Sequence, residues 1–284
     1  MTIGSLLQER DVEERNIAGR IIEINCAAHQ KWAHTFGKAQ PSQHLTERLI
    51  DDLKLQPPHA VLLALEPLRA ISDYVAGVVG PTESLPRGDG RPVIVFPGLA
   101  LSGAATADLR VRLQQLGYEL YDWEQGINNW PEADFDEWLL RLGTHLQRIH
   151  ARHGRPVSLI GWSLGGIYAR ELAKKYPKLV RQVITLATPF RDKHDSTHVG
   201  WLLTLLNGGA TRVDDALLAR LRVDPPVPSA SIYSQTDGMV AWQGCLGRET
   251  RRHRNIEVNR VSHMGMVHHP DVLRVVADLL VEPC

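Results

Sequence analysis

The chain has 284 residues, of which 43% are hydrophobic and 23% are charged, as in an ordinary soluble globular protein. Lysine plus arginine and aspartate plus glutamate each number 32, so the balanced charge gives no indication of a nucleic acid or an anionic membrane as partner. The three cysteines, Cys26, Cys245 and Cys284, are too few and too widely spaced for a disulfide framework or a Cys-x-x-Cys metal motif, which favours a reducing compartment.

The first residues of the chain lack the basic start and the apolar core of a secretory signal. No run of apolar residues approaches the roughly 18 to 20 that a transmembrane helix needs. These features predict a cytoplasmic protein without a transmembrane segment.

Residues 1–91 predict an N-terminal extension made of helices, because they contain no strand pattern. Within them, the apolar residues of 61–78 recur at helical spacing and predict one strongly apolar helix. Residues 80–90 are rich in glycine, proline and other turn residues, so they predict a linker.

From residue 92 to residue 284, strand and helix patterns alternate, which predicts a second, larger domain. The predicted strands are 93–96, 118–121, 156–160, 181–186, 231–234 and 256–259. The predicted helices are 106–116, 134–153, 167–175 and 271–281. Parallel neighbours need crossover connections, so this alternation predicts an α/β fold with a mainly parallel sheet and helices on both faces.

Residues 190–228 interrupt the alternation with an insertion that contains two short apolar segments, 200–206 and 216–221. Two small helices at the strand ends would suit a lid or one wall of a pocket. Ordinary crossover helices packed on the sheet are an equal alternative.

The segment Gly161-Trp162-Ser163-Leu164-Gly165-Gly166 lies between a predicted strand and a predicted helix. A serine in a sharp strand-to-helix turn is typical of a nucleophile elbow, in which the flanking glycines leave room for the strained backbone. A glycine-rich turn that contains serine by chance is the alternative, and the flanking elements argue against it. We therefore predict Ser163 as a nucleophile.

A serine nucleophile needs a histidine to take its proton and a carboxylate to orient that histidine. Asp237 and His263 follow Ser163 in the order expected for this architecture, and each comes just after a predicted strand. Asp237 has an alternative role as an ordinary turn aspartate before glycine. His268 and His269 have no carboxylate or thiol at ligand spacing, so we expect no metal site and no cofactor.

The tetrahedral intermediate of acyl transfer needs two backbone N–H donors for its oxyanion. Leu164 directly follows the nucleophile and provides one of them. Leu99, in the turn after the first predicted strand of the domain, provides the other, unless that turn is a simple Pro-Gly reversal.

With these residues assembled, the chain resembles the α/β-hydrolase superfamily and, more narrowly, bacterial lipase-like serine esterases. The shared motifs lie in the family's order at 96–99, 126–129, 161–166, 185–190, 234–238 and 262–265. The resemblance implies an α/β-hydrolase fold, a triad of Ser163, Asp237 and His263, and oxyanion donors at Leu99 and Leu164. It covers residue 92 to the end. Pro97-Gly98 stands where many lipases have His-Gly, and the antiparallel strands that usually open the fold are not visible.

The predicted activity is hydrolysis of a small-molecule carboxylic ester through an acyl-enzyme. The candidate pocket walls are Asn128, Asn129, Trp130, Leu202, Leu205 and Trp242, although each of these residues could equally pack in the interior. Thioesterase, amidase and acyltransferase activity on the same fold remain alternatives. A non-catalytic binding protein that works through its helical extension is a further alternative, and the apolar helix of that extension could also form a homodimer.

Overall fold

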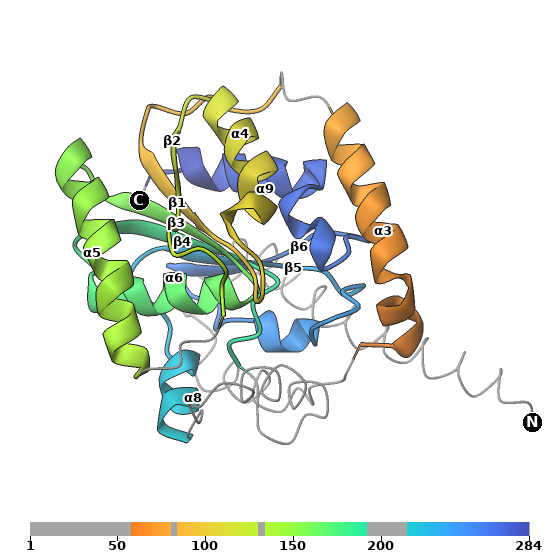
Figure 1. Cartoon of the computed structure of the whole chain (residues 1–284). Helices are drawn as coiled ribbons and strands as arrows, with labels where there is room; N and C mark the ends of the chain where they lie inside the picture. Colours follow the sequence, from red (N-terminus) through yellow and green to blue (C-terminus); the bar gives the residue numbers. More distant parts are fainter. Residues whose placement is uncertain (1–57, 81–83, 130–133, 192–214, 284) are drawn as a thin grey trace, which may run out of the picture. The chain divides into compact units, whose positions relative to one another are not determined.

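The computed structural model describes residues 58–80, 84–129, 134–191 and 215–283. Six strands form one sheet in the order β2-β1-β3-β4-β5-β6, and every neighbouring pair is parallel (Figure 1). The strands are β1 (Pro92–Phe96), β2 (Glu119–Asp122), β3 (Val157–Trp162), β4 (Val180–Leu186), β5 (Ser229–Tyr233) and β6 (His253–Glu257). This arrangement confirms the predicted α/β fold with a parallel sheet.

Alternate residues of the buried strands point to opposite faces of the sheet, and each face has its own hydrophobic core. Val93 and Val95 lie in a core with helices α4 (Ala107–Gln115) and α9 (Pro270–Val281). Ile94 and Phe96 lie in the other core. The helices that cover this second face are α5 (Phe135–His153), α6 (Leu164–Lys175) and α8 (Asp215–Arg222). The strand alternation thus gives a three-layer structure with helices on both faces.

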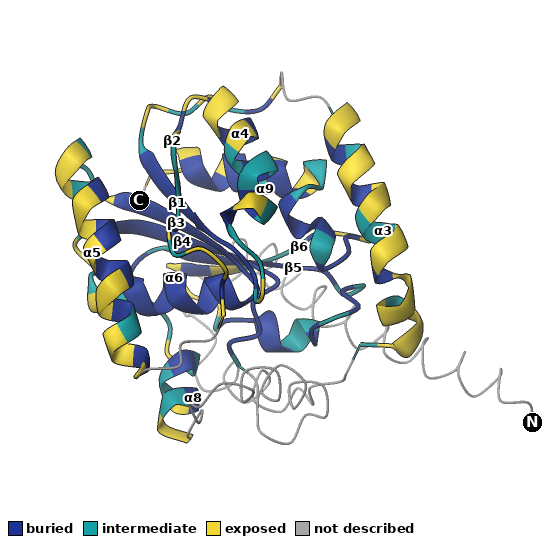
Figure 2. Ribbon diagram, in the orientation of Figure 1, coloured by how far each residue is buried: buried dark blue, intermediate teal, exposed yellow. Residues whose placement is uncertain are grey.

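Helix α3 (Ala60–Val79) is present where the apolar pattern predicts a helix, but most of its length is exposed (Figure 2), and its large apolar residues are among the exposed ones. Leu68 and Ile71 are 67% and 62% exposed. The buried residues of the helix are Glu66, Asp73 and Gly77. The helix therefore faces the rest of the chain with charged groups, the reverse of an ordinary surface helix.

The linker predicted at 80–90 packs closely against the end of α4. The N–H of Gly88 donates to the carbonyl of Leu116 at 2.7 Å, and the side chain of Leu85 is buried in the core beside α4. In residues 58–80 and 84–91 no strand precedes β1.

The last predicted strand differs from the structure, and the insertion is described in part. The last strand spans 253–257 and not 256–259, because β6 is an edge strand that pairs only with β5 and carries polar residues where the prediction relied on apolar ones. In the insertion, Leu218 and Leu221 of α8 pack in the core beside α6, as the crossover alternative expects. The first predicted helix of the insertion lies outside the described residues, so the lid stays a prediction.

None of the described helices is long and apolar enough to span a membrane.

Candidate active site

Ser163 occupies a strained turn between β3 and α6. Its backbone has φ 52° and ψ −121°, a conformation that few residues other than glycine adopt. The N–H of Ser163 donates to the carbonyl of Leu186 at 2.8 Å, which fixes the turn to the end of β4. The serine is thereby held at the carboxyl edge of the sheet.

The glycines around Ser163 are required by close packing of the backbone. A Cβ on Gly161 would lie 2.4 Å from the carbonyl oxygen of Gly165, and one on Gly165 would lie 2.4 Å from the carbonyl oxygen of Phe96. A Cβ on Gly166 would lie 2.0 Å from Oγ1 of Thr188. The glycines thus allow β1, β3 and α6 to meet at the serine.

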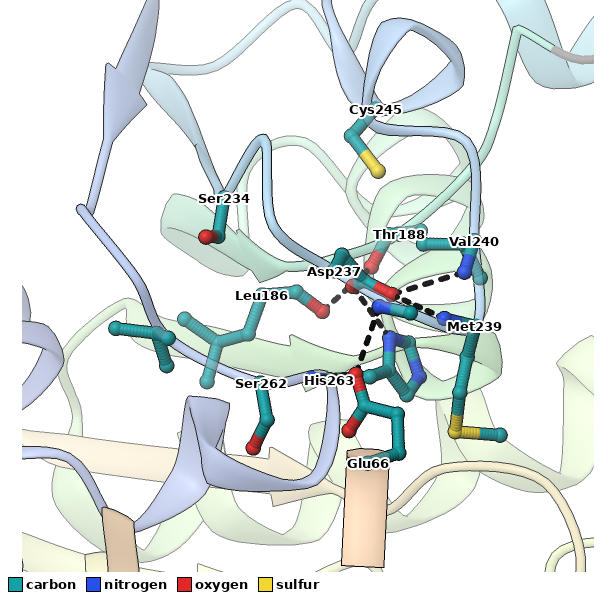
Figure 3. A network of polar contacts seen from close by, with 12 residues as sticks. Glu66, Leu186, Thr188, Ser234, Asp237, Met239, Val240, Cys245, Ser262 and His263 are labelled. Atoms are coloured by element: carbon teal, nitrogen blue, oxygen red, sulfur yellow. Dashed lines mark hydrogen bonds and ion pairs between the residues drawn. The ribbon is translucent and has the colours of Figure 1, made fainter. Parts of the chain in front are cut away.

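Asp237 and His263 form a buried pair beyond the ends of β5 and β6 (Figure 3). The Nδ1 atom of His263 lies 2.7 Å from Oδ2 of Asp237. The other carboxylate oxygen of Asp237 accepts the N–H groups of Met239 and Val240 at 2.8 and 2.9 Å. Both oxygens of the carboxylate thus make hydrogen bonds, and the side chain of Asp237 cannot rotate without losing them.

Two opposing effects determine the pKa of His263. Burial lowers this pKa, whereas the charge of Asp237 and its hydrogen bond raise it, with a further contribution from Glu66 in the same direction. The attraction is stronger, so the pKa of His263 lies above its ordinary value. The imidazolium that a general base becomes is therefore stabilised in this site.

The residue before Ser163 joins the serine turn to the histidine loop. The indole Nε1 of Trp162 donates to the carbonyl of His263 at 3.1 Å, and the two rings lie 5.9 Å apart. Among the described residues, no hydrogen bond connects the hydroxyl of Ser163 to the imidazole. Such bonds often form only when substrate is bound.

The two predicted oxyanion donors belong to two different segments near the serine. Leu164 is the first residue of α6, and Leu99 belongs to the turn after β1. That turn lies close to the serine, because a Cβ on Gly98 would be 3.5 Å from the Cβ of Ser163. In the described part of the chain, neither backbone N–H has a hydrogen-bond partner.

Asn128 holds the turn that carries Leu99. Its side chain is completely buried and donates to the carbonyl of Pro97 at 2.6 Å. Its backbone carbonyl accepts the N–H of Ala100 at 2.7 Å, and its N–H donates to the carbonyl of Leu101 at 2.8 Å. Asn128, predicted as a pocket wall, thus fixes the shape of this turn through three hydrogen bonds to its backbone.

Of the other predicted pocket residues, the structure describes Asn129 and Trp242. Asn129 is exposed, and Trp242 is half-buried with its ring stacked on Tyr233 at 5.5 Å. Trp130, Leu202 and Leu205 lie outside the described residues.

The sequence analysis missed Glu66, which lies on α3 beside the aspartate–histidine pair (Figure 3). One of its oxygens, Oε1, accepts the N–H of Gly238 at 2.7 Å and the N–H of His263 at 3.0 Å. The signal that could have found it is the charged set Glu66, Arg69 and Asp73, whose spacing places all three on one face of an otherwise apolar helix.

In the described part of the chain, no group of three or more histidine, cysteine, aspartate or glutamate side chains could hold a metal ion.

The family described as serine aminopeptidase, S33 has a sequence model that matches residues 90–243, more than half of the chain. The chain belongs to this family of α/β hydrolases. The matched segment of the hydrolase contains Ser163 and Asp237 but ends before His263, and α3 precedes it. No curated protein matches the sequence.

Solved structures confirm the fold. Lipase B of Aspergillus fumigatus matches the hydrolase with a TM-score of 0.52 and 20% identity, over 69% of this chain and 54% of the lipase. This chain therefore spans about half of that lipase. A Bacillus licheniformis lipase matches with a TM-score of 0.50 and 19% identity, over 70% of this chain and 95% of the lipase. A monoacylglycerol lipase of Paleococcus ferrophilus matches with a TM-score of 0.50 and 15% identity, over 68% and 96%.

Proposed function

We propose that this hydrolase cleaves carboxylic esters, with Ser163 as nucleophile, His263 as general base and acid, and Asp237 as the group that orients the histidine. The observation that carries the proposal is the buried 2.7 Å contact between Asp237 and His263, next to a strained serine turn. A serine in this conformation with such a pair at the same sheet edge fits the roles that nucleophilic acyl transfer requires.

In the proposed reaction, the hydroxyl oxygen of Ser163 attacks the carbonyl carbon of the ester while His263 takes its proton. The backbone N–H groups of Leu99 and Leu164 donate to the oxyanion of the tetrahedral intermediate. The intermediate expels the alcohol, which receives the proton from His263, and leaves an acyl group on Ser163. Water, deprotonated by His263, then releases the carboxylic acid and restores the serine.

An ester is our first substrate class, because the carboxylates nearest the histidine are already engaged. Asp237 binds His263, Glu66 binds two backbone N–H groups, and Asp73 binds Ser262. All three carboxylates are buried, and Oε2 of Glu66 has no hydrogen-bond partner among the described residues. We therefore assign them to holding the site and not to binding the ammonium group of a peptide substrate. The lipases with the same fold offer an analogy at the level of the fold.

Amide hydrolysis is the second candidate, because the matching family is described as serine aminopeptidase. Thioesterase and acyltransferase activity would use the same acyl-enzyme with a different leaving group or acceptor. A non-catalytic binding protein would need no paired histidine and aspartate beside the serine.

Labelling with a fluorophosphonate probe tests the nucleophile, with Ser163→Ala and the neighbouring Ser158→Ala as paired variants. We expect labelling of the wild type and of Ser158→Ala but not of Ser163→Ala, whose loss of ester turnover should be at least about a thousandfold. A labelled or active Ser163→Ala variant would refute the assignment. Turnover of p-nitrophenyl esters against aminoacyl p-nitroanilides then separates esterase from aminopeptidase activity.

Two further proposals concern the oligomeric state and the location of the protein. The exposed apolar side chains of α3 support a homodimer that forms through the N-terminal helices. Light scattering after size-exclusion chromatography tests this oligomeric state. A cytoplasmic location also remains a prediction, which fractionation of expressing cells would test.

A further inference from the structure

One face of α3 carries three charged side chains that all reach the loops after β5 and β6. Glu66, Arg69 and Asp73 lie three and four residues apart, so they lie along one side of the helix. Glu66 and Asp73 are only 4% and 7% exposed. Burial of charged groups costs free energy unless they are hydrogen-bonded. The hydrogen-bond partners of Glu66 and Asp73 therefore indicate which part of the protein the helix stabilises.

Glu66 joins the loop that carries His263, the proposed base, to the loop that carries Asp237, the carboxylate that orients it. Its Oε1 accepts the N–H of Gly238, the residue after Asp237, at 2.7 Å and the N–H of His263 itself at 3.0 Å (Figure 3). The approach is close, because a Cβ on Gly238 would lie 2.6 Å from the backbone of Leu62 in α3. One carboxylate oxygen thus fixes the separation between the two loops.

Arg69 and Asp73 bind the residues that directly precede Asp237 and His263 in the sequence. Arg69 donates to the carbonyl and the hydroxyl of Thr236, the residue before Asp237, at 2.6 and 2.9 Å. Asp73 accepts both the N–H and the hydroxyl of Ser262, the residue before His263. Asp237 is therefore held through both of its neighbours, and His263 through its own backbone and through the residue before it.

We propose that Glu66 is a positioning residue for the reaction, and that it makes α3 a working part of the active site. This inference rests on the proposed function. Glu66 touches no reacting atom and acts through His263 and Asp237. The two loops belong to different strands, and a charged acceptor holds backbone N–H groups more strongly than a neutral one. Loss of this link should let His263 and Asp237 move apart.

The Glu66 carboxylate also acts on the imidazole by its charge. The charged groups around His263 are Asp237, which binds the ring, Glu66, which binds its backbone, and Arg69 and Asp73 one step further out on α3. Of these, Asp237 and Glu66 raise the pKa of His263. Removal of the Glu66 charge should therefore lower this pKa and move the acidic limb of the pH–rate profile to lower pH.

The test compares Glu66→Ala, which removes the charge and the acceptor, with Glu66→Gln, which keeps an acceptor oxygen. Glu137→Gln is the control, because Glu137 is an exposed carboxylate on α5 whose ion pair, among the described residues, is with Arg141. Each protein is assayed with a p-nitrophenyl ester for kcat, KM and pH dependence, and by fluorophosphonate labelling and thermal unfolding.

We expect Glu66→Ala to lower kcat by about 10- to 100-fold with KM changed less than about twofold. Glu66→Gln should recover most of kcat while its acidic limb lies at lower pH than in the wild type. Glu137→Gln should behave as the wild type. A purely structural role would lower the unfolding temperature and leave the pH profile in place.

The proposal is overturned if folded Glu66→Ala keeps its kcat, or if the acidic limb of Glu66→Gln coincides with that of the wild type. If Glu66→Ala does not fold, the nearly isosteric Glu66→Gln decides through its pH profile. A wild-type protein that is not labelled at Ser163 would overturn the proposed function and the role of Glu66 together. Labelled wild type with unaffected Glu66 variants would overturn only the role of Glu66.

Discussion

The contact between Asp237 and His263 sets both the orientation and the charge of the imidazole. With Nδ1 donating to the carboxylate, Nε2 is the nitrogen left to accept a proton from the serine in the proposed reaction. The carboxylate is itself fixed by the N–H groups of Met239 and Val240. A change of one oxygen at this position should therefore alter catalysis without a large change in structure.

Asp237→Asn should lower kcat by about a thousandfold or more, because an amide can donate to Nδ1 and stabilise the wrong tautomer. Asp237 raises the pKa of His263, so any residual activity should have its acidic limb at lower pH. Steady-state ester hydrolysis from pH 5 to pH 9 measures both effects. Asp136→Asn, at an exposed position on α5, is the control, and near-normal rates in Asp237→Asn would assign the role to another residue.

A single methyl group in the serine turn should disrupt the fold. In Gly161→Ala the new Cβ would lie 2.4 Å from backbone atoms of Gly165 and Gly166, which cannot move without opening the turn. We expect a loss of about 3 kcal/mol or more in the free energy of unfolding.

Gly154→Ala is the matched variant for this prediction. Gly154 ends α5 with φ 61° and has nothing within 4 Å of an added Cβ. It should lose only about 1 kcal/mol, the cost of the left-handed backbone. Urea denaturation of both proteins makes the comparison, and equal losses would contradict the packing described for the turn.

At the level of elements, α3 reverses the ordinary relation between polarity and burial. Its apolar residues face outward, and its charged residues make the contacts with the loops after β5 and β6. Substitutions in this helix should therefore have effects opposite to those expected from hydrophobicity alone.

Asp73→Ala should destabilise the protein by about 2 to 3 kcal/mol, because it leaves the N–H and the hydroxyl of Ser262 buried without their charged partner. Leu68→Ser, at a residue that is 67% exposed, should change stability by less than about 0.5 kcal/mol. Chemical denaturation gives both values. A larger loss in Leu68→Ser than in Asp73→Ala would mean that the apolar face is covered in solution.

Local signals in the sequence were enough to predict most of the sheet and the elements that carry the site. The strand before Ser163 is a buried apolar run, and Gly161 is required by contacts with Gly165 and Gly166, only a few residues along the chain. The position of β6 was wrong by three residues at its start, because the polar residues His253 and Asn255 gave no strand signal. Glu66 was missed because a charge on a helix normally indicates the solvent face, and only the docking of α3 shows the opposite.

For the molecule as a whole, two buried histidines respond to pH in opposite directions. The pKa of His263 is raised, so its contribution to stability is complete below the ordinary pKa and is lost as the pH rises through the folded-state value. His253 is the first residue of β6, and its side chain contacts the hydroxyls of Ser229 and Ser231 on the neighbouring strand β5. Burial lowers its pKa to about 4.

Acid should therefore destabilise the fold through His253. Between about pH 6.5 and pH 4, His253 is protonated in the unfolded chain but stays neutral in the folded chain. The free energy of unfolding therefore decreases as the pH falls, by up to about 3 kcal/mol. The free energy of unfolding, measured at several pH values for the wild type and His253→Gln, checks this. A smaller slope in the variant is expected, and equal slopes would assign the acid sensitivity to other groups.

The contacts of α3 also determine which truncated fragments of the chain would keep the proposed site. The family model ends at residue 243, and α3 lies before its first residue. A fragment cut to the matched region would keep Ser163 and Asp237 but would lose His263 at one end and Glu66 at the other. The segment that the family model matches is thus shorter at both ends than the segment that the proposed site requires. A minimal working unit should begin before α3 and extend through α9.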